Sequence, residues 1–217
     1  DYLPLQPQEG ALSVDQYNPG DCVASDQFVV KTPGRLTTGY GRNSDDNCYH
    51  GGTLYTDVSS GLVQVVPQVS LGAGETLLGK ARFEEWIFNL AGVTVNRYHS
   101  DNGVYASSDF KQDCSDKDQV QSFSGVGAQH QNAHAERNIQ TLSYWARTMM
   151  VHCALHWPSD NADELNLWPF AMEHAAWLYN WLPNCVSGLT PLEVFTRTKS
   201  DHQDLLQAHV WGCPVFV

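Results

Sequence analysis

The sequence predicts an α/β protein in which a mixed β-sheet is flanked by helices. Three observations lead to this class. A hydrophobic content of 42% over 217 residues is enough to form a buried core. Short β-branched runs in the first 125 residues are interrupted by stretches of helical periodicity. Longer helical patterns then follow, and this order of elements is typical of a mixed sheet covered by helices.

Three strands are expected before the first helix. One begins near Cys22 and continues through the apolar run that ends at Val30. A polar, glycine-rich stretch over 32–52 is expected to be a loop. Two further runs, Thr53–Thr56 and Leu62–Val66, are separated by a short turn sequence with Asp, Ser and Gly, which favours an antiparallel pair.

The apolar period changes to that of a helix over 74–90, and Gly92 supplies a stop signal. A strand over 93–98, a short helix over 108–114 and a short strand over 120–123 are expected next. The apolar stripe of the first helix consists of Leu78, Phe83, Trp86, Ile87 and Leu90. The succession of strand, helix and strand adds two strands to the sheet.

The last third of the chain is expected to be mainly helical. A polar loop over 125–134 leads into a long helix over 134–156, and an aromatic-rich helix follows over 167–182. Thr190 followed by a proline is a helix start signal, and 210–217 has the composition of a strand. Core packing is the favoured use of the aromatic helix, and a dimer face is the alternative.

The balance of charge is strongly acidic. The chain has 24 acidic residues against 12 lysines and arginines, which gives a formal net charge of −12. Proteins that coat DNA without specificity usually carry a basic field, so the composition argues against that class. No stretch approaches the roughly 20 apolar residues of a membrane span, and no secretory leader is recognisable. We therefore expect a protein that neither spans a membrane nor is secreted.

The acidic excess is unevenly distributed. Residues 31–147 hold 12 acidic and 10 basic residues, whereas 1–30 and 148–196 each hold five acidic residues and no basic one. The middle of the chain is therefore close to neutral.

The six cysteines are scattered and include no Cys-x-x-Cys pair. A disulfide framework is more typical of smaller secreted chains, and a zinc knuckle needs a cysteine pair near a histidine pair. We therefore expect reduced, mostly buried thiols and a reducing compartment. The residues are Cys22, Cys48, Cys114, Cys153, Cys185 and Cys213.

Three acidic residues stand where this layout would bring carboxylates together. Asp26 lies within the first strand, Asp101 follows the strand after the first helix, and Glu136 lies in the first turn of the long helix. Singly, each has an ordinary explanation: an exposed sheet edge, an Asp-Asn-Gly turn and an acid favoured by the helix dipole. Together they form the oxygen-rich ligand set that Mg²⁺ prefers, and two such ions suit phosphodiester chemistry.

Asp57 and the pair His130 and His134 are also candidate metal ligands, and each has a competing explanation. Asp57 follows an apolar strand, but it also fits the turn acid of Asp-Val-Ser-Ser-Gly, which is the favoured interpretation. His130 and His134 are four residues apart, a spacing that would suit zinc on one helix face. The glutamate of a zinc-protease HExxH motif is missing, and His130 falls in the predicted loop, so we do not expect zinc there.

Three segments resemble the catalytic blocks of copia-type retrotransposon integrases. They are GDCVASDQF at 20–28, HSDNG at 99–103 and GVGAQHQNAHAERN at 125–138. Shorter downstream segments at 146–150, 167–169, 190–193 and 211–215 are also similar to stretches of such polyproteins. The resemblance covers about residues 19–217 in the expected order.

The resemblance implies a ribonuclease-H-like mixed five-stranded sheet flanked by helices. It assigns Asp26, Asp101 and Glu136 as the catalytic DDE triad and as ligands of Mg²⁺ or Mn²⁺ in a two-metal site. Members of this family trim the 3′ ends of element DNA and join them to target DNA by transesterification. The resemblance also implies DNA contacts by side chains around the start of the long helix, namely Gln131, Asn132, Arg137 and Asn138. Related sequences often have Gly where this chain has Ala133, which would make the loop stiffer.

The expected organisation is an arm or linker over 1–20, an integrase catalytic core over 21–200 and a truncated C-terminal extension over 201–217. The implied partners are element DNA ends, target DNA and further copies of the chain in a homodimer or higher assembly. The implied locations are the nucleus and a cytoplasmic virus-like particle. Two alternatives remain open: a ribonuclease-H-like nuclease that only hydrolyses, and a catalytically silent assembly module derived from an integrase.

Overall fold

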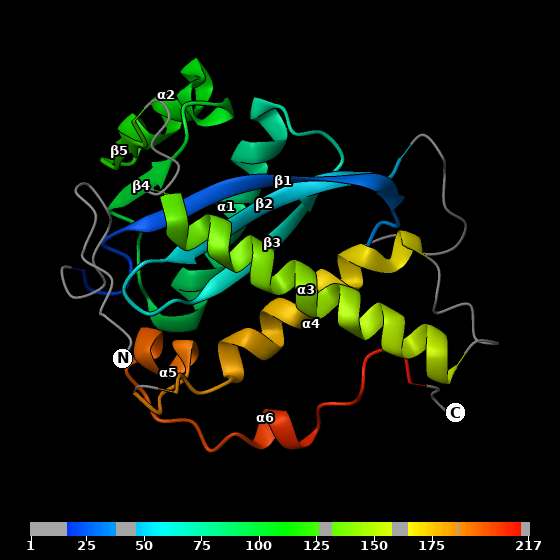
Figure 1. Ribbon diagram of the computed structural model, residues 1–217. Coiled ribbons are helices and arrows are strands. Elements are labelled where there is room, and N and C mark those ends of the chain that lie inside the picture. The colour runs from blue at the N-terminus through cyan, green and yellow to red at the C-terminus, as the bar shows by residue number, and fades with distance from the viewer. Residues whose placement is uncertain (1–16, 38–46, 126–131, 158–164, 186, 214–217) are drawn as a thin grey trace, which may run out of the picture.

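The computed structural model describes residues 17–37, 47–125, 132–157, 165–185 and 187–213. It contains a five-stranded sheet with strand order β3-β2-β1-β4-β5 (Figure 1). The strands are β1 (Val23–Gly34), β2 (Tyr49–Asp57), β3 (Val63–Gln68), β4 (Arg97–Ser100) and β5 (Val120–Phe123). The predicted α/β class with a mixed five-stranded sheet is confirmed.

The sheet is mixed because its two halves are connected differently. β1, β2 and β3 pair antiparallel, whereas β4 and β5 run parallel to β1. The connection from β3 to β4 passes through α1, and the connection from β4 to β5 passes through α2, as parallel pairing requires. β1 lies at the centre and pairs with β2 on one side and β4 on the other.

Helices cover both faces of the sheet. Figure 1 shows α3 and α4 crossing one face, with α1 behind the other. The helices are α1 (Ala73–Ala91), η2 (Val104–Ala106), α2 (Ser108–Asp116), α3 (Ala133–His156), η4 (Leu165–Leu167), α4 (Trp168–Trp181), α5 (Pro191–Thr196) and α6 (Gln203–Leu206).

The alternation of side chains along β2 builds a separate apolar cluster on each face. Tyr55 packs with Phe83 of α1 on one face, whereas its neighbour Leu54 packs with Leu142 of α3 on the other. Successive residues of a strand point to opposite faces, so both sides of a central strand must be apolar. Core packing of α4, the favoured interpretation, agrees with the burial of Met172 in the second cluster.

Several local signals act as the sequence predicts. Gly92 ends α1 in the left-handed conformation, and its N–H donates to the Phe88 carbonyl. Thr190 and Glu193 form a reciprocal capping box at the start of α5, with Pro191 in the first turn.

Three predicted boundaries are wrong. The loop predicted over 32–52 is shorter, because β1 extends to Gly34 and β2 begins at Tyr49; residues 38–46 lie outside the described part. The strand predicted over 93–98 begins only at Arg97, because Val95 is buried in the core without joining the ladder. Of the strand predicted over 210–217, the described part forms a turn. β-Branched residues mark buried backbone as well as paired backbone.

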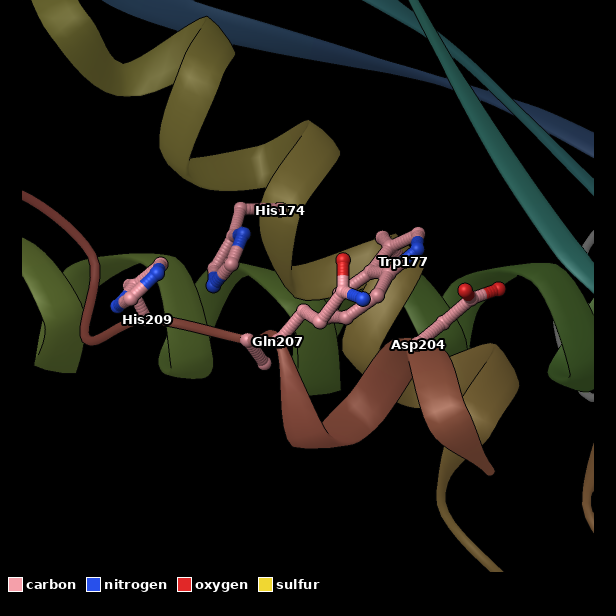
Figure 2. A pocket seen from close by; sticks show the side chains of 6 residues that line it. His174, Trp177, Asp204, Gln207 and His209 are labelled. Carbon is pink, nitrogen blue, oxygen red and sulfur yellow. The ribbon is translucent and has the colours of Figure 1, made fainter. Parts of the chain in front are cut away.

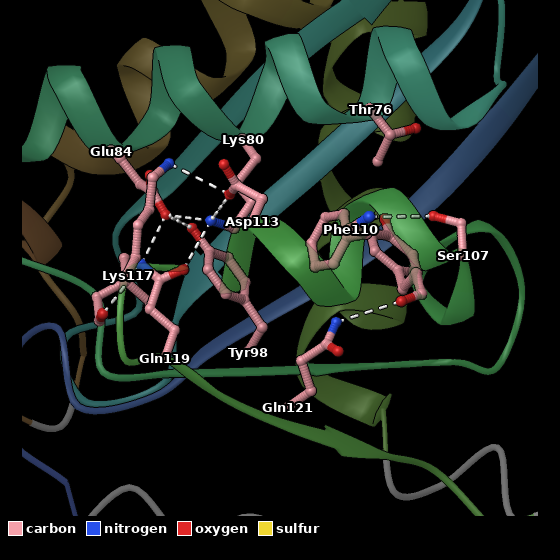
Figure 3. Close-up of polar contacts among 12 residues, drawn as sticks. Thr76, Lys80, Glu84, Tyr98, Ser107, Phe110, Asp113, Lys117, Gln119 and Gln121 are labelled. Carbon is pink, nitrogen blue, oxygen red and sulfur yellow. Dashed lines mark hydrogen bonds and ion pairs between the residues drawn. The ribbon is translucent and has the colours of Figure 1, made fainter. Parts of the chain in front are cut away.

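A buried lysine ties α1 to α2 and to the segment before β5 (Figure 3). Lys80 is fully buried, and its Nζ donates to Glu84 at 2.7 Å, to Gln119 at 2.6 Å and to Asp113. Glu84 also accepts a hydrogen bond from Tyr98 and forms an ion pair with Lys117. The charge of Lys80 is thus matched within the network, as a buried ammonium group requires.

All six cysteines lie among the described residues as thiols outside any disulfide, and Cys22, Cys114 and Cys153 are buried. Burial raises the pKa of Cys22 and of Cys114 to about 11, which keeps both thiols protonated. Among the described helices, none is both long and apolar enough to cross a membrane.

Candidate catalytic site

Asp26 and Asp101 are brought to the same level of the sheet by the parallel pairing of β1 with β4. Ala24 pairs with His99 in this ladder, and each aspartate lies two residues further along its own strand direction. Asp101 stands one residue beyond the end of β4, at the carboxyl edge where parallel strands commonly present functional side chains. The two carboxylates, 75 positions apart in the sequence, are therefore neighbours in register.

Asp26 is held within β1 and is only partly exposed. Its Oδ1 accepts a hydrogen bond from the Gln27 backbone N–H at 2.8 Å. Burial is the main cause that raises the pKa of Asp26 to about 6; the Gln27 hydrogen bond opposes this, and the negative charges of Asp101 and Glu136 add to it. The negative charges of the other two carboxylates predicted from the sequence thus act on Asp26.

Asp101 is exposed and is supported by its own turn. Its Oδ1 accepts a hydrogen bond from the Gly103 backbone N–H at 3.1 Å. A Cβ atom at residue 103 would lie 3.1 Å from Oδ1 and 3.3 Å from Oδ2 of Asp101. Glycine therefore leaves the space that this carboxylate occupies.

Glu136 lies in the first turn of α3 and is exposed. Together with Ala133, Arg137, Ile139 and Gln140 it lines a surface hollow of about 430 Å³. α3 packs across β1 and β2, so its first turn stands near the end of the sheet that carries Asp26. An exposed carboxylate on a rigid helix is accessible to a ligand that approaches from solvent.

The donor set suits a hard divalent cation. Asp26, Asp101 and Glu136 offer only carboxylate oxygens, which Mg²⁺ and Mn²⁺ prefer, and a bound cation would relieve the repulsion that raises the pKa of Asp26. Among the described residues, however, no group of three or more His, Cys, Asp and Glu side chains is gathered into a metal cluster. Asp101 and Glu136 are thus close enough to act on Asp26, but the three carboxylates do not form a closed cage.

The four predicted DNA-contacting residues fall into three groups. Gln131 lies outside the described residues, and Arg137 is exposed at the hollow beside Glu136. Asn132 and Asn138 are buried, with 3% and 8% exposure, and both donate hydrogen bonds within the protein. A DNA contact by any of them stays a prediction, but the two buried amides have packing roles in this structure.

Asp57 is the turn acid that the sequence favours. It is fully buried; its Oδ2 accepts hydrogen bonds from the backbone and hydroxyl of Ser60, and its Oδ1 accepts one from the Gly20 N–H. Burial raises the pKa of Asp57, and the Ser60 and Gly20 hydrogen bonds oppose that increase. Of the histidine pair, His134 lies in the first turn of α3, while His130 lies outside the described residues.

Sequence reasoning missed three residues that meet the start of α3. The Ser25 carbonyl accepts from Asn132, the Thr56 hydroxyl accepts from Asn138, and Tyr179 donates to Asn138. Ser25 is adjacent to Asp26, which is the only sequence signal that points to any of them. Their contacts join segments more than 40 positions apart, so no local pattern reveals them.

Other hollows also lie on the described surface. A cleft of about 530 Å³ between the β2–β3 turn, α3 and α5 shares Arg137 with the hollow beside Glu136. A second one, of about 370 Å³, lies between α4 and α6 and is lined by His174, Trp177 and His209 among others (Figure 2). Neither contains a residue of the carboxylate triad.

The fold is similar to that of several integrase catalytic cores. A chain of the simian T-cell lymphotropic virus intasome, solved in complex with PP2A regulatory subunit B56 gamma, shares 16% identity with a TM-score of 0.61. The HTLV-2 integrase catalytic core domain in complex with magnesium, in its dimeric form, shares 21% identity with a TM-score of 0.54. The catalytic core domain of BIV integrase shares 14% identity with a TM-score of 0.56.

These matches each cover 82% of this chain. They cover 96% of the HTLV-2 chain and 95% of the BIV chain, but this chain spans only 55% of the intasome chain. No protein-family model and no curated protein sequence matches the chain. The likeness establishes that the fold is the ribonuclease-H-like fold of retroviral integrase catalytic cores.

Proposed function

We propose that this chain is the catalytic core of a copia-type retrotransposon integrase, a polynucleotidyl transferase that processes 3′ DNA ends and joins them to target DNA. One observation carries the proposal: Asp26, Asp101 and Glu136 come from β1, the end of β4 and the start of α3 of an integrase-core fold, and the negative charges of Asp101 and Glu136 act on Asp26. The resemblance of the three segments around these residues supports the copia-type assignment.

Under this proposal the three carboxylates hold Mg²⁺ or Mn²⁺. Bound divalent ions would activate the attacking oxygen and stabilise the leaving oxygen of the phosphodiester. Asp26 supplies a ligand fixed on the central strand, whereas Glu136 supplies an exposed one from the first turn of α3. Arg137, exposed beside Glu136, would contact a DNA phosphate.

Two successive substitutions at phosphorus follow from this proposal. In the first, a water oxygen bonds to phosphorus near the 3′ end of the element DNA, and the P–O bond to the preceding 3′ oxygen breaks, which leaves a free 3′ hydroxyl. In the second, that hydroxyl oxygen bonds to a phosphorus of target DNA, and the target's 3′ oxygen leaves with a proton. Both steps place the same demand on the carboxylates, which is to keep the reacting phosphate in line with the attacking oxygen.

The test is a DNA assay with Mn²⁺ or Mg²⁺ on blunt and on preprocessed DNA ends. We expect trimming of blunt ends and joining of preprocessed ends by the unaltered chain, and loss of both in Glu136→Gln. Glu85→Gln is the matched control, because it makes the same chemical change at an exposed position of α1.

The outcomes separate the alternatives. Hydrolysis without any joining would favour a nuclease over a transferase. Unaltered activity in Glu136→Gln would contradict the role of that residue. Absence of both activity and Mn²⁺ binding by calorimetry would favour an assembly module, which the resemblance also leaves open.

A further inference from the structure

We propose that Asn132 and Asn138 are positioning residues, which attach the first turns of α3 to the sheet and thereby fix Glu136 relative to Asp26. Glu136 acts in catalysis under the proposed function, on which this inference rests. The two asparagines flank Glu136 in the sequence and are both buried, whereas Glu136 itself is exposed.

Asn132 attaches the start of α3 to β1. Its Nδ2 donates to the backbone carbonyl of Ser25 at 3.3 Å, and Ser25 immediately precedes Asp26. Asn132 occupies the N-cap position of α3, where an asparagine side chain ordinarily accepts a hydrogen bond from the helix backbone. Here the side chain makes no such capping bond. The side chain contacts β1 instead.

Asn138 attaches the second turn of α3 to β2 and α4. Its Nδ2 donates to Thr56 Oγ1 at 3.2 Å, and its Oδ1 accepts from the Tyr179 hydroxyl at 3.3 Å. Thr56 is fully buried and pairs with Ala24 of β1 in the antiparallel ladder. A buried amide is costly without partners, so these two bonds select one placement of the helix over others.

The two attachments act on Glu136 through a rigid helix. Adjacent α-helical residues are turned by about 100°, so Glu136 and Asn138 face nearly opposite sides of α3. Ala135 is fully buried against Cys22 and Ala24, and its small side chain permits a close approach of the helix to β1. Glu136 therefore projects from a turn that is attached to the sheet through Asn132 before it, Ala135 beside it and Asn138 after it.

The first test measures the attachment itself. Hydrogen–deuterium exchange is followed in Asn138→Ala, Thr56→Val and the unaltered chain, at the backbone amides of 137–142 that close the first α3 turns. Thr56→Val removes the acceptor hydroxyl with little change of volume, and Thr56→Ser retains it. We expect faster exchange at 137–142 in Asn138→Ala and Thr56→Val, and nearly unaltered exchange in Thr56→Ser.

Asn180→Ala is the matched control. Asn180 is also a buried amide, at 6% exposure, and both of its polar atoms bond to the backbone of Val63. It lies in α4, and its removal should destabilise the protein without altering exchange at 137–142. Equal exchange at 137–142 in Asn138→Ala and the unaltered chain would overturn the proposal, whether or not the chain is active.

The second test measures the consequence at Glu136. A displacement of about 1 Å at a catalytic group can lower a rate by about 100-fold. We expect Asn138→Ala to lower kcat for DNA joining by about that factor with KM for DNA unchanged, and to weaken Mn²⁺ binding. Asn180→Ala should retain kcat at a temperature where both variants are folded.

These results separate the inference from the proposed function. An unaltered chain that neither binds Mn²⁺ nor reacts would contradict the proposed function, while the exchange data would still decide the attachment. An active chain in which Asn138→Ala and Asn180→Ala have the same kcat would overturn the positioning role and leave the proposed function standing.

Discussion

Asp26 combines two conditions that disfavour an ionised carboxylate. It is largely buried in the central strand, and it lies near two further negative charges. Its pKa is raised to about 6 from an ordinary value of 3.8, so folding is opposed by the charge of Asp26 at neutral pH. A strained electrostatic arrangement of this kind is typical of sites that use their charge for binding or catalysis.

We expect Asp26→Asn to unfold at a higher temperature than the unaltered chain at pH 7 in the presence of a chelator. The raised pKa means that the unfolded chain ionises before the folded one as pH rises from about 4 to 6, which costs the unaltered chain stability. The difference between the two melting temperatures should therefore shrink as pH falls from 6 to 4. Thermal unfolding followed by circular dichroism measures it. A lower melting temperature for Asp26→Asn at pH 7 would contradict the expectation.

Gly103 lies directly against the carboxylate of Asp101. A methyl group at residue 103 would press on the carboxylate of Asp101, which is the flexible end of an exposed side chain. We expect Gly103→Ala to change the melting temperature little but to weaken Mn²⁺ binding, because Asp101 must turn away. Calorimetric titration with Mn²⁺ measures this, and Gly74→Ala is the control, since a Cβ there meets nothing within 4 Å.

At the scale of elements, the network around Lys80 joins α1, α2 and the segment that leads to β5. Burial opposes ionisation of Glu84, but hydrogen bonds from Lys117 and Lys80 outweigh it and lower the pKa of Glu84. Burial likewise opposes ionisation of Asp113, and the hydrogen bond and charge of Lys80 outweigh it. The network thus fixes the half of the sheet that carries Asp101.

We expect Lys80→Met to lower the free energy of unfolding by about 3 kcal/mol, because it leaves Glu84 and Asp113 without their buried partner. Lys117→Met should cost less than about 1 kcal/mol, since Lys117 is 40% exposed and solvent screens its ion pairs. Urea unfolding at pH 7 measures both. Equal costs for the two variants would contradict the importance of burial.

The same network predicts the sensitivity of the protein to acid. Carboxylates with a lowered pKa contribute stability above their ordinary values of 3.8 and 4.5, and this stability is lost as pH falls through the lowered values. The dependence of stability on pH below about 4 should therefore be weaker in Lys80→Met than in the unaltered chain.

At the scale of the whole molecule, the distribution of charge affects how strongly the chain can bind DNA. The net charge is −12, yet residues 31–147, which supply Asp101 and Glu136, hold 12 acidic and 10 basic residues. The acidic excess lies mainly in 1–30 and 148–196, at five residues each. The acidity therefore does not argue against DNA chemistry at the site, but few cations are available for phosphate contacts.

We expect this chain alone to bind DNA weakly at physiological salt. Affinity for DNA comes largely from lysine and arginine contacts to phosphates, and the hollow beside Glu136 offers Arg137 as its only cation among the described residues that line it. Fluorescence anisotropy with a labelled duplex measures this. A dissociation constant below about 1 μM at 150 mM salt would contradict the expectation, since non-specific binding at that salt is typically weaker.

The sequence by itself determined most elements and the identity of the three carboxylates. Helical periodicity, the Gly92 stop and the Thr190 capping box are local signals, so α1, α3, α4 and α5 could be predicted from them. The resemblance places Asp26, Asp101 and Glu136 in the three segments that are similar to integrase catalytic blocks. In addition, carboxylates on two strands and a helix suit metal binding. The boundaries of β1, β2 and β4 could not be predicted from the sequence. Where a strand begins and ends depends on which residues pair with the neighbouring strand.

Only the tertiary structure decided what the amides around Glu136 do. The sequence predicts that Asn132 and Asn138 contact DNA. In the structure both are buried, and their hydrogen-bond partners Ser25, Thr56 and Tyr179 lie between 41 and 107 positions away. It also settled Asp57 as a turn acid bound by Gly20 and Ser60. Local backbone preferences act over a few residues, whereas a buried polar group takes whichever partner the packed elements bring to it. For that reason the sequence identified the residues of the candidate site, and the packing of α3 on the sheet decided which of them are exposed and which are buried.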